Sequence, residues 1–395
     1  MSRHGRAAFA FIFVTVALDM LALGVVIPVL PRLLIELKGG DVAGAAVVSG
    51  VFGFAWAAMQ FLFSPLMGAL SDRFGRRPVI LLSNLGLGLD GVLMALAPTL
   101  PWLFAGRLIS GITSSSYPCA GAYVADVTPP EERAARFGML GAAFGLGFVV
   151  GPALGGLLGG VSPRLPFWVS AALSLVNAAY GFFILPESLP AGRRKPFDWR
   201  AAHPFGSLAF LRSNPGLLGL AAAAFLFYAA HESLPSTFVL YTGFRYGWSA
   251  PREGFVLGLL GTLSAAVSAL LVGPAVERLG ERAVLGVGLV CGGLGFTVYA
   301  LSKTGAGFLA GVPLIALWSL ATPALQTLLS RQVAPEEQGR LQGALAGLRG
   351  VTGMVGPLVF TQVFAAAMAT RLPGAPYLVA LGLLAASLGL SRQAD

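Results

Sequence analysis

The chain has 395 residues, of which 56% are hydrophobic and only 11% are charged, and its mean hydropathy is +0.79. Ordinary soluble domains carry roughly 25% charged residues, so this composition excludes a typical soluble enzyme or binding module and predicts a membrane protein. The net charge of +9 would also suit a nucleic-acid-binding protein, but the placement of the basic residues argues against that class.

Twelve stretches are long and apolar enough to cross a hydrocarbon core of about 30 Å, which takes roughly 20 helical residues. The 53 glycines and 26 prolines do not oppose this, since membrane helices tolerate both residue types. The sequence therefore predicts an all-α membrane protein with twelve transmembrane helices, near residues 7–30, 46–70, 79–98, 101–124, 137–160, 165–185, 216–240, 254–276, 283–301, 307–329, 341–368 and 373–390.

Three landmarks recur at one offset of 205 residues. The polar segment GALSDRFGRR at 68–77 returns weakened as GPAVERLGER at 273–282, PEE at 130–132 returns at 335–337, and GP at 151–152 returns at 356–357. The chain therefore reads as two copies of one membrane unit, which is typical of a transporter. We predict a six-helix bundle at 1–186, a polar linker at 187–215 along the cytoplasmic interface, and a second six-helix bundle at 216–395.

The basic residues are distributed unevenly between the two faces. With the N-terminus in the cytoplasm, 17 of the 26 Lys and Arg residues fall on that side, seven on the other, and two, Arg107 and Arg349, inside spans. Cytoplasmic loops of membrane proteins carry such an excess, so both termini are predicted to be cytoplasmic. The charge sets topology, and the expected surroundings are membrane lipid, with no nucleic acid bound.

Five short motifs occur in order along nearly the whole chain, at 18–31 (LD followed by IPVLP), 68–77, 107–111 (RLISG), 147–156 (GFVVGPALGG) and 337–357. On these motifs the chain resembles the major facilitator superfamily, and within it the drug/proton antiporters typified by bacterial tetracycline efflux proteins. The resemblance implies two pseudo-symmetric bundles around a central cavity and a place in the bacterial inner membrane. We expect a monomer that carries small molecules and protons and needs no cofactor.

Charged side chains inside the membrane are expensive and are functional candidates by default. A carboxylate there can exchange a proton, and a cationic or polar substrate favours its ionised form, so proton and substrate can compete for one site. We therefore predict proton coupling at Asp19, Asp90 and Glu232. The alternatives are structural: Asp19 as a cap or partner within the first half, and Asp90 bonded to neighbouring serines.

Polar side chains inside other spans are candidates for substrate contact, namely Gln60, Tyr117, His231 and Arg349. Gln60 matches a polar position of tetracycline exporters, although a lone membrane glutamine also serves as an interhelical hydrogen bond. Tyr117 belongs to the run TSSSYP at 113–118, which alternatively provides close helix packing and a proline kink.

The segment 68–77 is interpreted as a tight turn and conformational latch at the membrane face. Its charges can bond to helix ends and across the two halves in one conformation only. The resemblance adds the arginine of the fourth helix and the glycine-proline pair of the fifth to this gating group, which comprises Gly68, Asp72, Arg73, Gly75, Arg76, Arg77, Arg107, Gly151 and Pro152. Arg107 has an alternative role as an anchor for helix packing.

The chain departs from the tetracycline exporters at two coupling positions. Their histidine of the eighth helix aligns with Ser264, and their aspartate of the ninth helix aligns with Cys291 or Gly292. In their place the second half carries His231, Glu232 and Arg349 at membrane depth. We expect Glu232 and Arg349 to pair, either as a functional site or as a static salt bridge.

The leading hypothesis is a proton-driven exporter of drug-like or amphipathic small molecules. One alternative is a carrier of an anionic or zwitterionic metabolite, with Arg349 and Arg107 as ligands. The other is a membrane-embedded enzyme or a non-transporting receptor. The sequence shows no nucleophile–base set and no His/Cys cluster with metal spacing, so neither an enzyme nor a metal site is expected.

Overall fold

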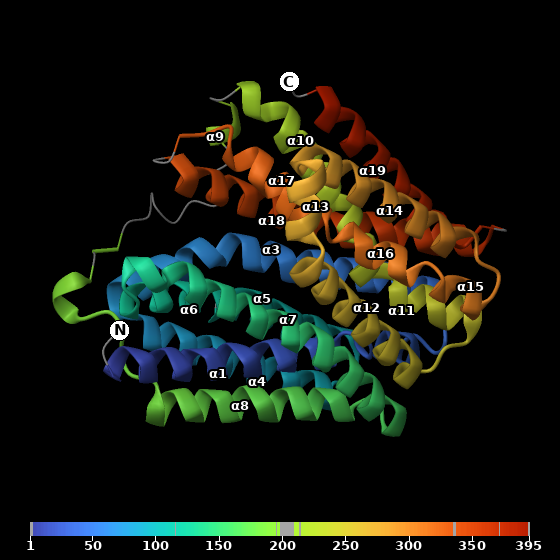
Figure 1. Ribbon diagram of the computed structural model, residues 1–395. Coiled ribbons are helices and arrows are strands. Elements are labelled where there is room, and N and C mark those ends of the chain that lie inside the picture. Colours follow the sequence, from blue (N-terminus) through green and yellow to red (C-terminus); the bar gives the residue numbers. More distant parts are fainter. Residues whose placement is uncertain are drawn as a thin grey trace. The chain divides into compact units, whose positions relative to one another are not determined.

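The computed structural model describes residues 3–114, 116–194, 196–197, 209–212, 215–334, 337–370 and 372–393. Residues 195, 198–208 and 213–214 of the expected linker therefore lie outside the described part, as do 335 and 336 of the repeated PEE motif. Within the described ranges the chain is helical and contains no β-strand (Figure 1). The predicted all-α class is confirmed.

Eleven helical segments of the described chain are long and apolar enough to span a membrane. The remaining predicted span, at 101–124, is divided into α5 (Leu100–Thr113) and α6 (Ser116–Val127), neither of which reaches spanning length alone. The first span is also interrupted, because Pro28 lies between α1 (Arg3–Val26) and α2 (Leu30–Leu37), and proline cannot donate the backbone hydrogen bond that would continue the helix.

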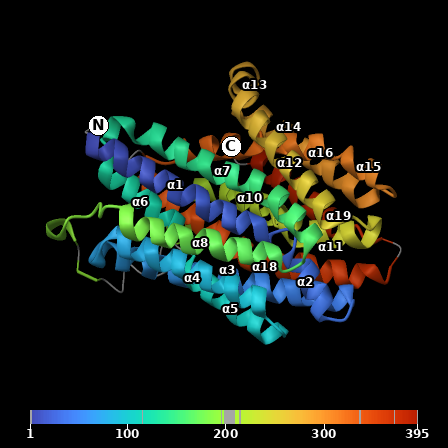
Figure 2. The same cartoon turned by 90° about the horizontal axis from the view of Figure 1, so that it is seen from below.

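Contacts divide the chain into two compact units. Unit 1 comprises Met1–Leu37, Ala55–Pro204 and Ser249–Gly258. In it, α1 packs against α7 and α8, and α4 packs against α8 and α5, as the neighbouring ribbons of Figure 2 show. The helices of this unit are α1, α2, α3 (Val42–Phe74) from Ala55 onward, α4 (Arg76–Leu96), α5, α6, α7 (Pro130–Val161), α8 (Leu165–Ile184), the 3-10 turn η1 (Ala191–Arg193) and the first turns of α12 (Ala250–Leu270).

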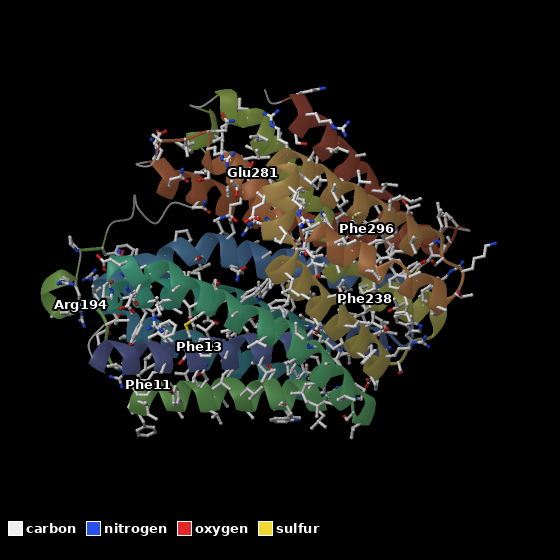
Figure 3. The ribbon with its side chains drawn as sticks, in the orientation of Figure 1. Phe11, Phe13, Arg194, Phe238, Glu281 and Phe296 are labelled. Carbon is white, nitrogen blue, oxygen red and sulfur yellow. The ribbon has the colours of Figure 1, made fainter. Side chains whose placement is uncertain are left out.

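The core of unit 1 forms around the inner face of α1. Phe9, Ile12 and Val16 are buried against Tyr123 of α6 and Leu140 of α7. Phe11 and Phe13, labelled in Figure 3, project from the same helix, and Phe11 meets the Tyr180 ring of α8 edge-on at 6.3 Å. Burial of this apolar face holds α1 between α6, α7 and α8.

Unit 2 comprises Lys38–Phe54, Phe205–Trp248 and Leu259–Asp395. In it, α10 and α14 both pack against α19, and α14 also packs against α16 and α17. The helices of this unit are the first part of α3, α9 (Ala209–Arg212), α10 (Pro215–His231), α11 (Ser233–Tyr246), α12 (Ala250–Leu270) from Leu259 onward, α13 (Val272–Leu279), α14 (Glu281–Leu301), α15 (Gly305–Leu309), α16 (Val312–Trp318), α17 (Ala321–Ser330), α18 (Gln338–Met368) and α19 (Ala375–Gln393).

An aromatic cluster fills the interior of unit 2. The Tyr299 and Phe308 rings stack 3.8 Å apart, and Phe296 of α14 stacks on Tyr377 of α19 at 6.0 Å. Phe238 of α11, labelled with Phe296 in Figure 3, approaches Phe308 at 5.8 Å. Such ring pairs stabilise beyond the area they bury, and the cluster joins α11, α14, α15 and α19.

The two copies of the repeated polar segment form the same turn. Gly75, with φ of 109°, is the single residue between α3 and α4, and Gly280, with φ of 77°, is the single residue between α13 and α14. A side chain would strain either backbone. The tight turn predicted at 68–77 is therefore present, and its counterpart 205 residues later adopts the same form.

Candidate transport site

Asp19 lies on α1 with none of its surface exposed. The Asn177 amide nitrogen of α8 donates to an Asp19 carboxylate oxygen at 2.7 Å and to the Thr15 carbonyl at 2.8 Å. With its amide nitrogen facing the carboxylate, Asn84 of α4 donates to both Asp19 oxygens at 3.0 and 3.1 Å, while its oxygen accepts from Asn177 at 3.2 Å. The carboxylate thus ties three helices together, and we call Asp19, Asn84 and Asn177 the amide clamp.

Asp90 of α4 forms an ion pair with Arg107 of α5. Both side chains are largely buried, with 4% and 12% of their surface exposed. The partner of Asp90 is therefore an arginine and not the neighbouring serines. The two residues meet because α4 packs against α5, which brings positions 17 residues apart into contact. Arg107 is likewise engaged within unit 1.

The other polar candidates of unit 1, Gln60 and Tyr117, lie on α3 and α6. The Gln60 side-chain nitrogen donates to the Ser114 hydroxyl at 3.0 Å, at the break between α5 and α6. Tyr117 is exposed and meets the Phe144 ring edge-on at 5.3 Å, and Phe144 stacks on Phe148 at 4.7 Å. Gln60 therefore forms an interhelical hydrogen bond, which is the alternative role named for it above. The bond holds Ser114, the residue that follows the last turn of α5.

Unit 2 carries its polar candidates at the junction of α10 and α11. His231 is exposed, and its ring lies 5.5 Å from that of Trp318, the last residue of α16. Glu232 is half-buried at the junction itself and packs against Gly356 of α18, where a Cβ would overlap the Glu232 side chain. Two helix breaks, after His231 and after Trp318, therefore lie side by side.

The expected pair between Glu232 and Arg349 does not form. The Arg349 guanidinium instead lies 4.6 Å above the Tyr228 ring and donates to the Tyr228 hydroxyl at 3.1 Å. The reason is register: Glu232 faces Gly356, which lies seven residues beyond Arg349, or about 10 Å along an α-helix. The prediction of this contact was wrong.

The positions at which the family places its other coupling groups have ordinary packing roles here. The Ser264 carbonyl accepts from the Ser319 hydroxyl at 3.3 Å. Cys291 is partly buried and free, and Gly292 lies against the Trp318 ring, where a Cβ would come within 2.7 Å. The described residues contain no group of three or more His, Cys, Asp or Glu side chains that could hold a metal ion.

The predicted latch contains a charge network centred on Arg76. This side chain bonds to Asp72 at 2.6 Å and to Asp126, near the end of α6, at 3.1 Å. The Glu187 carboxylate accepts from the backbone N–H groups of Arg76 at 2.9 Å and Arg77 at 3.3 Å, at the start of α4, where a helix favours negative charge. The segment is thus held by α6 and by the residues after α8.

The remaining members of the segment are less engaged. The Arg77 side chain donates to the Phe182 carbonyl, and Arg73 is exposed, with its guanidinium 5.1 Å from the Phe74 ring. Gly68 has open space where a side chain would stand. Only part of the sequence motif therefore enters the charge network.

The second copy of the segment repeats this ion pair with its charges exchanged. Glu281 and Arg331 lie 205 residues after Arg76 and Asp126, and their side chains bond at 2.5 Å. Arg331 is 64% exposed, whereas Arg76 is only 12% exposed. The repeat therefore preserves the contact, with the more buried version in the first copy.

Gly151 serves a close helix crossing between α1 and α7. A Cβ on Gly151 would lie 2.6 Å from the Gly24 Cα atom, and Gly24 in turn faces the Gly147 carbonyl at 2.6 Å from its own ideal Cβ. Small residues four apart allow helix backbones to approach in this way. Pro152 lies inside α7 immediately after this crossing.

An ion pair that the sequence pattern did not indicate joins α2 to the start of α12. The Arg32 Nε and Nη2 atoms both donate to Glu253, at 3.0 and 2.9 Å, and the Glu253 side chain has no exposed surface. Asn84, Asn177 and Tyr228 were missed as well. Two of these carried a signal, because an asparagine inside a long apolar stretch needs a buried hydrogen-bond partner.

The chain is similar to known proteins in sequence and in fold. The model of the Major Facilitator Superfamily matches residues 12–357. The chain is 40% identical to the class C tetracycline resistance protein of Escherichia coli over 92% of this chain and 91% of that protein, and 38% identical to the class D protein of Salmonella ordonez over 88% and 87%. The crystal structure of a human organic anion transporter superposes with a TM-score of 0.73 at 25% identity, covering 99% of this chain and 100% of that one.

Proposed function

Because this chain belongs to the Major Facilitator Superfamily, and within it to the tetracycline resistance proteins, we propose that it exports tetracycline-like amphipathic molecules in exchange for protons. It is a multi-pass membrane protein and a secondary active transporter, and its homologues are transporters rather than enzymes. The observation that carries the proposal is the similarity to the class C protein over about nine-tenths of both chains.

Asp19 is the proposed proton carrier. In its ionised form the carboxylate accepts hydrogen bonds from both asparagines of the amide clamp. A proton on the carboxyl group turns one acceptor into a donor, which the Asn84 amide can meet only by turning its oxygen toward Asp19. Protonation therefore changes the bonds that join α1 to α4 and α8, and this links the proton to a rearrangement of helices.

The other candidate residues take supporting parts in this proposal. Glu232 is a second protonation site at the break between α10 and α11, and the pair of Asp90 and Arg107 relays occupancy between α4 and α5. Gln60 and Tyr117 contact substrate from α3 and α6. The latch around Arg76 biases the conformational equilibrium rather than substrate affinity, because a contact made in one state only shifts the populations of the two states.

We further propose the arrangement in the cell. The chain is a monomer in the bacterial inner membrane, surrounded by lipid, with both termini and the 187–215 linker in the cytoplasm. Its functional halves are 1–186 and 216–395, which alternate between two orientations. The excess of Lys and Arg on the side of the termini supports this topology.

The carrier of an anionic or zwitterionic metabolite is less well supported. That alternative used Arg349 and Arg107 together as ligands, and Asp90 already neutralises Arg107. The resistance proteins that the chain resembles also favour a drug-like substrate.

Everted membrane vesicles test the proposal. Vesicles containing the full chain should accumulate tetracycline when an acid-inside pH gradient is imposed, and the accumulated drug should leave when nigericin collapses the gradient. Vesicles without the protein are the control. Accumulation that is equal in both preparations, or that survives the loss of the gradient, would contradict proton-coupled export.

A further inference from the structure

Arg349 is a charged residue inside a membrane span that has no role in the proposed proton exchange. It lies on α18 eleven residues after the start of the span Gln338–Met368, and Tyr228 lies eleven residues after the start of the span Leu217–Tyr246. At 1.5 Å per residue both lie roughly 16 Å from the starts of these spans, each of which is about 45 Å long. A hydrocarbon core of about 30 Å centred on such a span begins about 8 Å from its start, so the contact lies inside the hydrocarbon core.

No acidic side chain of the described chain forms an ion pair with Arg349. Tyr228 supplies a ring face and one hydroxyl acceptor, which occupies a single donor of the five on a guanidinium. A cation–π contact is weaker than a charge-assisted bond to a carboxylate. An arginine at this depth is expected to have a counter-charge, and the described protein does not provide one.

Glu232 does not fill this role. It packs against Gly356, about 10 Å along α18 from Arg349. The guanidinium lies instead over the Tyr228 ring, and the Phe227 ring lies 5.6 Å from that of Tyr228. His231 follows Tyr228 by three residues, so it lies on the same face of α10, and its exposed ring adds a further donor.

We propose that Arg349, held by Tyr228 and flanked by His231, binds the acidic group of a planar aromatic substrate. The missing counter-charge then belongs to the ligand, whose carboxylate or enolate accepts from the free donors of the guanidinium while its ring lies along Tyr228. This inference rests on the proposed function, because it names the chemical class of the exported molecule. It assigns the acidic end of the substrate to unit 2.

Arg340 is a matched control on the same helix. Its guanidinium also lies 4.6 Å from an aromatic ring, that of Phe210, but it bonds to Glu337 at 3.5 Å. The two arginines thus share the ring contact and differ in having an acidic partner. Only the unpaired one should discriminate in favour of an anionic ligand.

The test measures binding of three probes to the purified full chain by isothermal titration calorimetry. 1-Naphthoate, 1-naphthamide and 1-naphthylmethylammonium share one ring system and differ in charge. The native protein should bind the acid on the order of 10-fold more tightly than the amide, as expected for a charge-assisted hydrogen bond. Arg349→Met should remove this preference by weakening binding of the acid more than binding of the amide, and Arg340→Met should keep it.

Two further variants keep the test decisive if Arg349→Met does not fold. Arg349→Lys retains the charge but loses the planar fork, and Tyr228→Phe removes the hydroxyl that orients it; each should reduce the preference for the acid. Equal affinity of the native protein for acid and amide, or a preference that survives in these variants, would overturn the inference. Tetracycline export in vesicles is scored separately: export without an acid preference refutes only this site, whereas an acid preference without export refutes the proposed function.

Discussion

The crossing of α1 and α7 predicts opposite effects for alanine at two glycines of α7, Gly151 and Gly145. Alanine at Gly151 would place its Cβ 2.6 Å from the Gly24 Cα and 2.8 Å from the Gly24 carbonyl carbon, both backbone atoms that cannot rotate away. Ordinary carbon contacts begin near 3.5 Å, so the helices would have to separate by roughly 1 Å. Overpacking of this kind destabilises by about 1–3 kcal/mol.

Gly145 on the same helix has no atom within 4 Å of its ideal Cβ. Alanine there should stabilise the helix by about 0.5–1 kcal/mol, because glycine is the poorer helix former. Thermal unfolding of the purified variants, followed by circular dichroism, should therefore show Gly151→Ala below the native protein and Gly145→Ala at or above it. If the unfolding temperature of Gly151→Ala is not lower than that of Gly145→Ala, α1 and α7 do not approach each other as closely as described.

Two ion-pair predictions follow from burial. Glu253→Gln should lower the free energy of unfolding by about 1.5–3 kcal/mol, because it removes the charge-assisted hydrogen bonds that Arg32 donates to this fully buried carboxylate. The effects of Glu253→Gln and Arg32→Met should not add in the double variant; simple additivity in the unfolding measurements would show that the two side chains act independently. Of the repeat-related pairs, Asp126→Asn should destabilise more than Glu281→Gln, whose exposed pair contributes about 1 kcal/mol or less, and equal shifts in denaturation midpoint would contradict this order.

The sequence was sufficient for features that depend on local pattern. Long apolar stretches predict spans because the membrane requires about 20 such residues wherever they lie. The turn at Gly75 followed from charged residues and a glycine between two of these stretches. The break of the fourth span near Ser114 and of the first at Pro28 shifted helix ends without changing the architecture.

The partners of the buried polar residues were not predictable in the same way. Asp19 meets Asn177 across 158 positions, and the choice depends on how α1 and α8 are rotated about their axes. For Arg349 the sequence favoured the residue of opposite charge, Glu232, whereas helix register brings Tyr228 to it instead. Charge identifies which residues need a partner, but tertiary packing selects the partner.

The most direct test of proton exchange at Asp19 uses the purified full chain reconstituted in liposomes that contain a pH-sensitive dye. With tetracycline supplied on one side and no imposed gradient, the native protein should move protons against the flow of drug, and the dye should report this in proportion to transport. Asp19→Asn should still exchange labelled for unlabelled tetracycline but move no protons. Drug-dependent proton movement that persists in Asp19→Asn would contradict this role for Asp19, and its absence from the native protein would contradict antiport itself.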